Sequence, residues 1–242
     1  MNGLANLEPS KNGSKVLTGS IEQKFVFRNV MSDQLEGWLE HSCFRDPIFH
    51  NGPVSSIYYD TLDMALLDEK LNGDFQKIKI RLRWYVDLET CSPEHEVPCF
   101  MEAKSKTGVL RDKDRGEIII SAKTLKENPF SDERILNAPF EARNWTQRRL
   151  PHLFPMMVIS YRRRRFVDQG SGSRISLDTD IICRKSNPQF FTSSVPFQLA
   201  AGVLEIKGGH DAWISSLDPV AHLLKKAAFS KYSQCCEYLL SI

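Results

Sequence analysis

Charged side chains alternate with apolar ones in several short stretches of this sequence. The clearest case is residues 75–86, where four cations share one parity and four apolar residues share the other. The cations are Lys77, Lys79, Arg81 and Arg83, and the apolar residues are Ile78, Ile80, Leu82 and Trp84. A period of two predicts a β-strand with one cationic and one apolar face. Arginine binds phosphate oxygens in a planar, bidentate manner and lysine acts as a point charge, so this face could bind phosphate.

Glutamate precedes lysine by two residues in three other predicted strands. These pairs are Glu22 and Lys24, Glu102 and Lys104, and Glu205 and Lys207. Further cations occur in two more stretches, as Arg111, Lys113 and Arg115 and then as the run from Arg162 to Arg165. Carboxylates among these cations would repel phosphate unless a hard cation joined them to it, and Mg²⁺ and Mn²⁺ prefer oxygen ligands. The pattern therefore predicts a metal-bound oligophosphate as the ligand.

These residues also have purely structural interpretations. A basic strand face can be solvated, with its charges in water. Four carboxylates could pair with lysines instead of binding a metal: Glu22, Glu102, Asp178 and Asp180. Three cations could lie at a tunnel mouth and only steer anions: Lys77, Lys79 and Arg111. The run of four arginines must point two side chains to each face, and the pattern does not say which pair lies inside.

Eight stretches have the alternation of a strand. They are residues 21–27, 54–60, 75–86, 100–106, 109–120, 156–167, 173–184 and 202–208. Helices are predicted at 32–42, 62–71, about 140–150, about 219–228, and in a last segment ending near residue 240. Eight strands match the size at which a closed sheet has a narrow interior. We therefore predict an α+β fold, a closed eight-stranded antiparallel β tunnel with a charged interior, covered outside by helices.

The overall composition is that of one large soluble domain of 242 residues. Residues 1–19 lack hydrophobic periodicity and predict a flexible N-terminal leader, which leaves 20–242 as a single domain. Neither a bilayer-spanning apolar run nor a signal peptide is evident, so we predict a cytoplasmic protein that does not insert into membranes. A net charge of only +2 does not predict nucleic acid as a partner. The six cysteines lack the spacing of a zinc site or a disulfide framework.

Eight short motifs occur in a fixed order along the chain. They are Glu22-x-Lys24, Arg81-Leu-Arg83-Trp-Tyr85, Glu102-x-Lys104, Lys113-x-Arg115, Ser160-Tyr161-x-Arg163, Arg174-Ile-Ser-Leu-Asp178, Leu204-Glu205-Ile-Lys207 and Ser230-Lys231-Tyr232. From about residue 21 to the end, this series resembles the polyphosphate-polymerase domain of the vacuolar transporter chaperone (VTC) family, a branch of the triphosphate tunnel metalloenzymes. Eight motifs in register make the resemblance specific.

The resemblance implies a tunnel in which ATP gives its γ-phosphoryl group to a growing inorganic polyphosphate chain, with release of ADP. ATP and polyphosphate are then the expected partners, and Mn²⁺ or Mg²⁺ is the expected cofactor. Glu205 is the implied metal ligand. The implied catalytic, phosphate-binding set is Arg81, Arg83, Lys104, Lys113, Arg163 and Lys231. The implied supporting cations are Lys24, Arg115 and Lys207.

Two other functions stay open on the same scaffold. One is a metal-dependent triphosphatase that releases inorganic phosphate, and the other is a non-catalytic polyphosphate-binding module. Tunnel enzymes that hydrolyse triphosphate or make cyclic AMP typically begin with Glu-x-Glu-x-Lys, whereas Ser20 holds the place of the first glutamate here. This departure disfavours that branch. None of the three functions needs a protein nucleophile, because phosphoryl transfer depends mainly on positioning and charge neutralisation.

Overall fold

The computed structural model describes residues 21–108, 110–142, 152–208 and 213–241. The strands are β1 (Ile21–Arg28), β2 (Cys43–Arg45), β3 (Asn51–Asp60), β4 (Gln76–Trp84), β5 (Glu96–Thr107), β6 (Leu110–Ser121), β7 (Phe154–Asp168), β8 (Arg174–Ser186), β9 (Phe197–Gln198), β10 (Ala201–Gly208) and β11 (Lys225–Lys226). The helices are α1 (Ser32–Ser42), α2 (Ala65–Leu71), α3 (Ala122–Glu127), α4 (Glu133–Ala142) and α5 (Lys231–Leu240), with short 3-10 helices η1 (Asn29–Met31) and η2 (Ser215–Leu223). The predicted leader, residues 1–19, lies outside the described residues.

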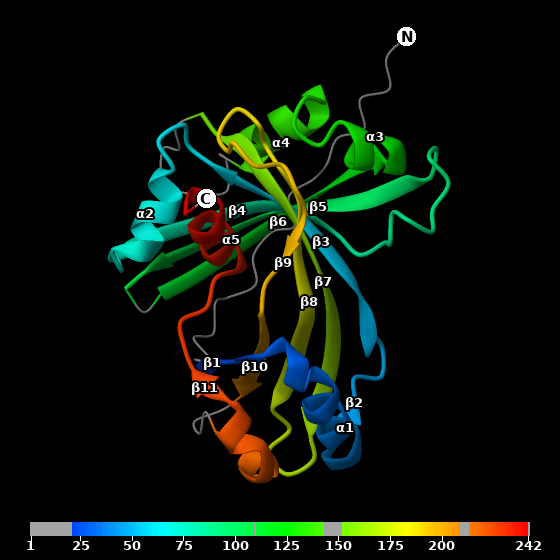
Figure 1. The fold of residues 1–242 in the computed structure, drawn as a ribbon, viewed down its shortest axis with the longest axis vertical. Helices are drawn as coiled ribbons and strands as arrows, with labels where there is room; N and C mark the ends of the chain where they lie inside the picture. Colours follow the sequence, from blue (N-terminus) through cyan, green and yellow to red (C-terminus); the bar gives the residue numbers. More distant parts are fainter. Residues whose placement is uncertain (1–20, 109, 143–151, 209–212, 242) are drawn as a thin grey trace, which may run out of the picture.

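The strands form one large sheet with antiparallel pairing (Figure 1). Its order is β11-β1-β10-β8-β7-β3-β4-β5-β6, with β2 beside β7 and β9 beside β8. The strands of eight or more residues are β1, β3, β4, β5, β6, β7, β8 and β10, and each contains or overlaps one of the eight predicted strands. The α+β class is therefore confirmed, in a sheet enlarged by three short strands.

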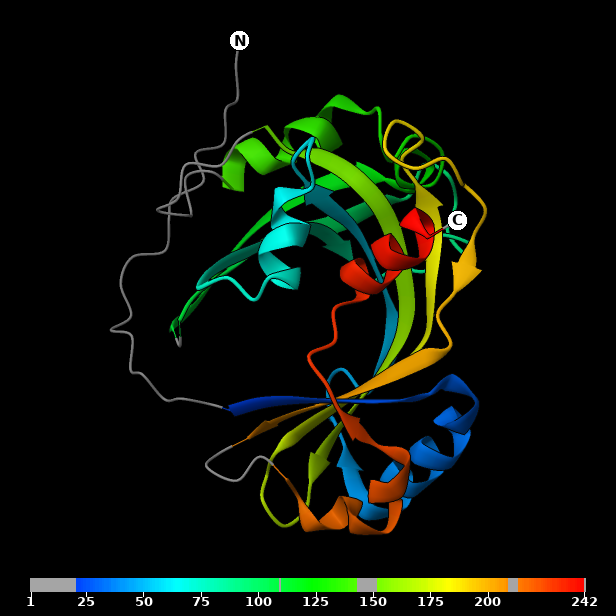
Figure 2. The same cartoon turned by 60° about the vertical axis from the view of Figure 1, so that its left-hand side comes forward.

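The sheet curls strongly, but hydrogen bonds do not close it. Figure 2 shows the long strands bending in an arc, with β1 crossing below it. Among the described residues, no ladder joins β6 to the other end of the sheet. Part of the free edge of β1 is taken by β11, where Phe25 pairs with Lys226, so β6 has no complete edge to join. An open sheet of eleven strands is thus observed in place of the predicted closed eight-stranded tunnel.

The apolar face of β4 lies on the outer, convex side of the curl, as its alternation predicts. Its four apolar residues, Ile78, Ile80, Leu82 and Trp84, are all buried. Helices α2, α3 and α4 cover them through Leu66, Leu125 and Ile135. At the other end of the sheet, α1 and η2 cover the outer face of β1, β8 and β10 in the same way. Burial of these outer faces leaves the charged faces turned inward.

Helix α5 departs from the prediction that helices lie only outside. It packs on the inner face through Tyr232, Cys235 and Cys236, which contact the same cluster as Met157 and Ile159 of β7. Figure 2 shows α5 on the concave side of the arc. The physical reason is that the inward positions of β7 are apolar in its first half and become charged only later in the strand. The apolar half of the inner face therefore needs a cover of its own.

Three helix boundaries also differ from those predicted. Helix α2 begins at Ala65 because Met64 has a left-handed backbone with φ of 56°. The segment predicted as a helix at 219–228 forms η2 and β11 instead, with Pro219 inside the 3-10 turns. Helix α4 ends at Ala142, whereas the predicted helix at 140–150 falls mostly on residues 143–151, which lie outside the described ranges. No helix in the described part of the chain has the length and apolarity to cross a membrane.

Candidate functional site

Charged side chains from opposite walls of the curled sheet act on one another, so they share one space. Burial, and then repulsion from Arg81 and Lys207, lowers the pKa of Lys104 to about 8, while Glu22 and Glu205 oppose this shift. Lys104 lies on β5, whereas the two glutamates lie on β1 and β10 near the other end of the strand order. We call the space between these inner faces the bore. The charged faces of separate strands therefore meet in it.

Glu102 is the centre of a first group, the Glu102 cluster, formed with Arg81, Arg83 and Lys113. Arg81 donates to Oε2 of Glu102 through Nε at 2.9 Å and Nη2 at 2.7 Å. Lys113 Nζ lies 3.1 Å from Oε1, and Arg83 Nη1 lies 3.6 Å from Oε2. Burial raises the pKa of Glu102, but Arg81 and Arg83 outweigh it and bring the pKa to about 2. The carboxylate is thus ionised and orients two predicted phosphate-binding arginines.

Asp178 is the centre of the second group, the Asp178 cluster. Arg163 lies directly opposite it across the β7–β8 ladder and donates to both carboxylate oxygens, at 2.6 and 2.7 Å. Lys231, the first residue of α5, donates to Oδ2 at 2.6 Å. Burial opposes ionisation, yet these two cations hold the pKa of Asp178 well below its usual range. The start of α5 is thereby tied to the sheet by a buried ion pair.

Glu205 and Glu22 form the third group, the Glu205 cluster, with two lysines. Along the β1–β10 ladder, Lys24 lies opposite Glu205 and Glu22 lies opposite Lys207. Lys207 Nζ is 2.8 Å from Glu205 and 3.9 Å from Glu22, and Lys24 Nζ is 3.4 Å from Glu22 and 3.9 Å from Glu205. Burial raises the pKa of Glu205, but Lys24 and Lys207 outweigh it and hold the pKa well below normal. Both glutamates are therefore candidate ligands that already share cations.

The donor set of the Glu205 cluster fits a divalent cation that arrives with phosphate. The described residues contain no group of three or more His, Cys, Asp or Glu side chains able to hold a metal ion. Mg²⁺ is usually bound by one or two protein carboxylates together with substrate phosphates and water, and not by a complete protein cage. Glu205 and Glu22 could supply that number of carboxylates. The chemistry of the site is thus compatible with Mn²⁺ or Mg²⁺ bound jointly by protein and ligand.

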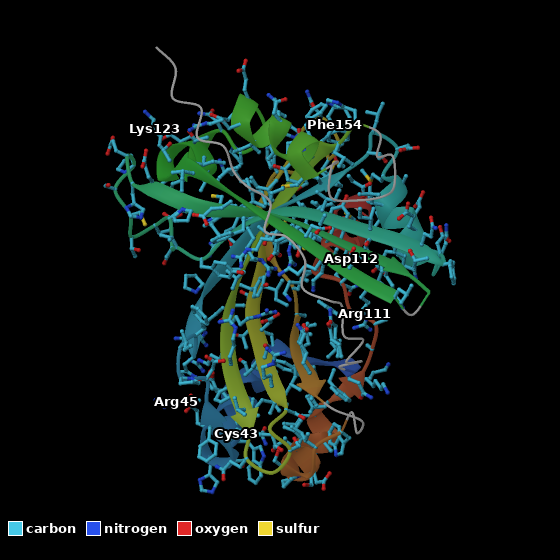
Figure 3. All side chains as sticks on the ribbon, turned by 180° about the vertical axis from the view of Figure 1, so that it is seen from behind. Cys43, Arg45, Arg111, Asp112, Lys123 and Phe154 are labelled. Atoms are coloured by element: carbon cyan, nitrogen blue, oxygen red, sulfur yellow. The ribbon has the colours of Figure 1, made fainter. Side chains whose placement is uncertain are left out.

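An ion pair spans the gap between the two ends of the sheet. Arg111 Nη1 on β6 lies 3.6 Å from Glu22 Oε2 on β1. Figure 3 marks Arg111 near the end of β6. The arginine side chain is 54% exposed, so the contact is a weak one. It nevertheless shows that β6 and β1 face each other across the bore.

Arg83 and Arg115 differ in their exposure and in their contacts. Arg83 is buried and also donates to Ser56 Oγ at 3.3 Å and to the Tyr161 hydroxyl at 3.1 Å. Arg115 is exposed, and its guanidinium lies over the ring of Phe100, 3.6 Å from the centroid. Among the described residues, Arg115 has no carboxylate within 4 Å of its guanidinium nitrogens, although its strand position is opposite Glu102. Arg115 therefore borders the bore without joining an ion-pair cluster.

The structure shows how arginines of the run at residues 162–165 are oriented relative to the bore. Arg163 points into the bore, whereas Arg162 and Arg164 point outward and contact Glu36 of α1. Asp180, one of the four carboxylates considered as partners of lysines, does not share the face of Asp178 and has an arginine as its ion-pair partner among the described residues. It lies near Arg162 on the outer side, at 3.8 Å. Its φ of 52° and the irregular β7–β8 register reverse the alternation at this point.

Tyr161 is a candidate functional residue that charge patterning did not single out. Its hydroxyl accepts from Arg83, and Lys231 Nζ lies 4.2 Å from the centre of its ring. Burial raises the pKa of Tyr161, but Arg163, Arg83 and Lys231 outweigh burial and lower it to about 8. The sequence signal that could have identified Tyr161 is its position two residues before Arg163, because alternate residues of a strand share a face. Tyr161 links the Glu102 and Asp178 clusters.

Two comparisons with known proteins found similarities to this chain. The family model described as the VTC domain matches residues 20–240. The fold is similar to that of a candidate adenylate cyclase from Bacillus halodurans, with a TM-score of 0.51, 14% identity, and coverage of 89% of this chain and 96% of that one. Comparison with curated protein sequences gave no match. Since the family model spans nearly the whole chain, this protein belongs to the VTC domain family.

Proposed function

We propose that this protein is a metal-dependent polyphosphate polymerase. In the proposed reaction, the γ-phosphoryl group of ATP is transferred to a growing inorganic polyphosphate chain and ADP is released, in the cytoplasm and without nucleic acid. The observation that carries the proposal is the meeting of cations from β1, β4, β6, β7, β10 and α5 around three buried acidic centres. Such a bore suits a ligand with many regularly spaced negative charges.

The proposed roles follow the three clusters. Arg81, Arg83, Lys104, Lys113, Arg163 and Lys231 bind and orient phosphoryl oxygens, and Lys24, Arg115 and Lys207 support them. Glu205 holds Mn²⁺ or Mg²⁺, which when bound neutralises charge on the transferred group and the leaving diphosphate. No protein group has to remove a proton from the acceptor, because the terminal phosphate of the growing chain is already ionised.

The buried carboxylates have a positioning role in this proposal. Arg81 uses Nε and one hydrogen of Nη2 on Glu102, and Arg163 uses the same two groups on Asp178. A guanidinium has five N–H donors, so each arginine keeps others for a phosphate. Fixing the guanidinium planes before the ligand binds reduces the ordering cost of binding. The carboxylates therefore orient the arginines without exhausting their donors.

We propose that the predicted closed tunnel forms when a phosphate chain is bound. Arg111 and Glu22 already bring β6 and β1 within ion-pair distance. A phosphate chain between these strands would neutralise the cations of both and allow the walls to approach. We therefore propose an eight-stranded tunnel around the chain.

Incubation of the purified protein with ATP and Mn²⁺, and separately with Mg²⁺, tests the function. The expected products are long phosphate chains and an equivalent amount of ADP. Release of inorganic phosphate without chains would instead assign a triphosphatase, and binding without turnover would assign a polyphosphate-binding module. Glu205→Gln should lower metal-dependent turnover by about a hundredfold. Glu127→Gln, an exposed change of equal charge on α3, is the matched control.

A further inference from the structure

The lysines of β4 and β5 form like-charged pairs directly across the ladder. Lys79 lies opposite Lys104, and Lys77 lies opposite Lys106. One pair further along the same inner face, the facing residues are Arg81 and Glu102, which have opposite charges. Like charges directly opposite each other destabilise a sheet. Two successive pairs of this kind therefore need a physical explanation.

Five lysines of this region form no ion pair within 4 Å with the described residues. They are Lys70, Lys77, Lys79, Lys104 and Lys106, which we call the lysine patch; none of their Nζ atoms has a described carboxylate oxygen within 4 Å. Lys70 comes from α2 and the others from β4 and β5. Only Lys104 belongs to the predicted catalytic set. The other four extend the cationic surface beyond it.

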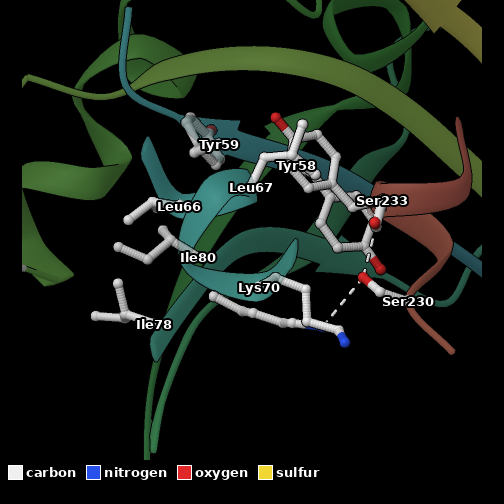
Figure 4. A pocket seen from close by; sticks show the side chains of 11 residues that line it. Tyr58, Tyr59, Leu66, Leu67, Lys70, Ile78, Ile80, Ser230 and Ser233 are labelled. Carbon is white, nitrogen blue, oxygen red and sulfur yellow. Dashed lines mark hydrogen bonds between the residues drawn. The ribbon is translucent and has the colours of Figure 1, made fainter. Parts of the chain in front are cut away.

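Lys79 shows that the lysine patch is not an ordinary solvated face. Its Nζ donates to Ser230 Oγ at 3.1 Å, in the region drawn in Figure 4. Burial, followed by repulsion from Lys24 and Lys70, lowers the pKa of Lys79 to about 7. Repulsion from Lys77, Lys24 and Lys106 also contributes, after burial, to a lowered pKa of Lys70. Partly buried cations that repel one another are poised to bind an anion.

The position of the lysine patch relates it to the bore. Residues 77 and 81 of β4 are four apart, which is about 13 Å along a strand. The lysine patch thus extends the inner cationic face by the length of several phosphates beyond the Glu102 cluster. Its lysines offer point charges without the bidentate geometry that fixes a single phosphoryl group. This chemistry suits a repetitive polyanion that passes over the surface.

We propose that the lysine patch is a subsite for the distal phosphates of a long inorganic polyphosphate chain, outside the centre that holds the reacting triphosphate. This inference rests on the proposed function and adds chain-length selection to it. Binding of the chain neutralises the facing lysines, so the stabilisation lost in the free protein is recovered in the complex. A tripolyphosphate is too short to occupy both regions and gains little from the lysine patch.

The test compares two ligands on three proteins by titration calorimetry without ATP. The ligands are long-chain inorganic polyphosphate and tripolyphosphate, and the proteins are the wild type, Lys77→Gln/Lys106→Gln, and Lys123→Gln/Lys126→Gln. The control pair removes the same charge from α3, on the outside of the sheet (Figure 3). We expect the patch variant to lose about tenfold in affinity for the long chain and less than about twofold for tripolyphosphate. The control should resemble the wild type for both ligands.

Loss of affinity for both ligands to an equal degree, or for neither, would overturn the subsite. Thermal melting without ligand keeps the result interpretable, because removing the repulsion between Lys77 and Lys106 should leave the variant at least as stable as the wild type. The ADP assay reports separately on the proposed function. A wild type that selects long chains but forms no ADP would retain the lysine patch and remove the polymerase.

Discussion

The Glu102 cluster and the lysine patch lie side by side on the same inner face, and they hold positive charge in opposite ways. In the Glu102 cluster, two arginines and a lysine surround a carboxylate that is 2% exposed. In the lysine patch, one pair further along the β4–β5 ladder, lysine faces lysine. Each cation of the Glu102 cluster therefore already has a carboxylate partner, whereas the lysines of the patch have none within 4 Å among the described residues.

The two arrangements suit two different tasks, positioning of the reacting group and capture of a long chain. Arginines held by a buried carboxylate have fixed planes, which suits a reacting group that must be placed accurately. Lysines that repel one another have flexible side chains and a high local potential, which suits a chain that slides or varies in length. The two regions together can bind one long ligand while fixing only the end that reacts.

The largest expected effect comes from removing the central carboxylate. Glu102→Gln leaves Arg81 and Arg83, neighbours on the same face of β4, without their shared carboxylate, and breaking such a buried pair costs about 3 kcal/mol or more. We expect a loss of that size in the free energy of unfolding, measured with urea in phosphate-free buffer. At the same time the variant should bind tripolyphosphate more tightly, because loss of the negative charge outweighs loss of the fixed guanidinium planes and the unpaired cluster then resembles the lysine patch.

Glu127→Gln is the control for this prediction, since it removes one exposed carboxylate from α3. Its free energy of unfolding should stay within about 0.5 kcal/mol of the wild type. If Glu102→Gln were equally mild, the carboxylate would not be needed to hold the arginines, and the distinction between the two regions would fail.

A second prediction uses neighbouring arginines that point to opposite faces. Arg163→Gln leaves the buried Asp178 with Lys231 alone, which should cost about 2 kcal/mol in the free energy of unfolding and weaken tripolyphosphate binding. Arg164→Gln removes an outer contact to Glu36 and should cost less than about 1 kcal/mol. Equal losses of tripolyphosphate affinity in the two variants would contradict the assignment of Arg163 to the bore.

Much of this arrangement could be predicted from residue alternation. The two faces of β4 are placed as predicted because every second residue is apolar and helices are available to cover those residues. The cross-strand ion pairs of β1 and β10 follow from two Glu-x-Lys motifs that face each other in antiparallel register. Alternation identifies which side chains share a face. Alternation therefore predicted which strand faces line the bore.

Alternation could not predict features that depend on irregular backbone or on partners distant in sequence. The positive φ of Asp180 directs its side chain away from the inner face, and no local sequence pattern predicts that reversal. Helix α5 lies inside because Met157 and Ile159 need cover, although the same strand turns charged at Arg163. For Lys77 and Lys79 the sequence offered a role in steering anions, because the cations that repel Lys79, Lys24 of β1, Lys70 of α2 and Lys104 of β5, come from separate elements. Alternation also gives no information on closure of the sheet, where part of the β1 edge is paired with β11.

A smaller effect is expected when the lysine patch loses its most buried cation. The pKa of Lys79 is about 7 in the folded protein, against about 10.4 in an unfolded chain. Between these values the unfolded chain binds the additional proton, so the free energy of unfolding should rise with pH from about 7 to about 10. Lys79→Gln should flatten this rise, as measured by urea unfolding at a series of pH values. An unchanged slope would show that Lys79 titrates normally.

The smallest effect is spectroscopic and reports on both regions at once. Burial alone would raise the pKa of Tyr161, but Arg163, Arg83 and Lys231 lower it to about 8, so ultraviolet difference absorbance should detect tyrosinate near that pH. The signal should be absent in Tyr161→Phe. Bound tripolyphosphate would neutralise the same cations and move the transition to higher pH. Saturating long-chain polyphosphate should move it no further, because the additional phosphates lie over the lysine patch and not beside Tyr161; a much larger shift with the long chain would place those phosphates in the centre of the bore.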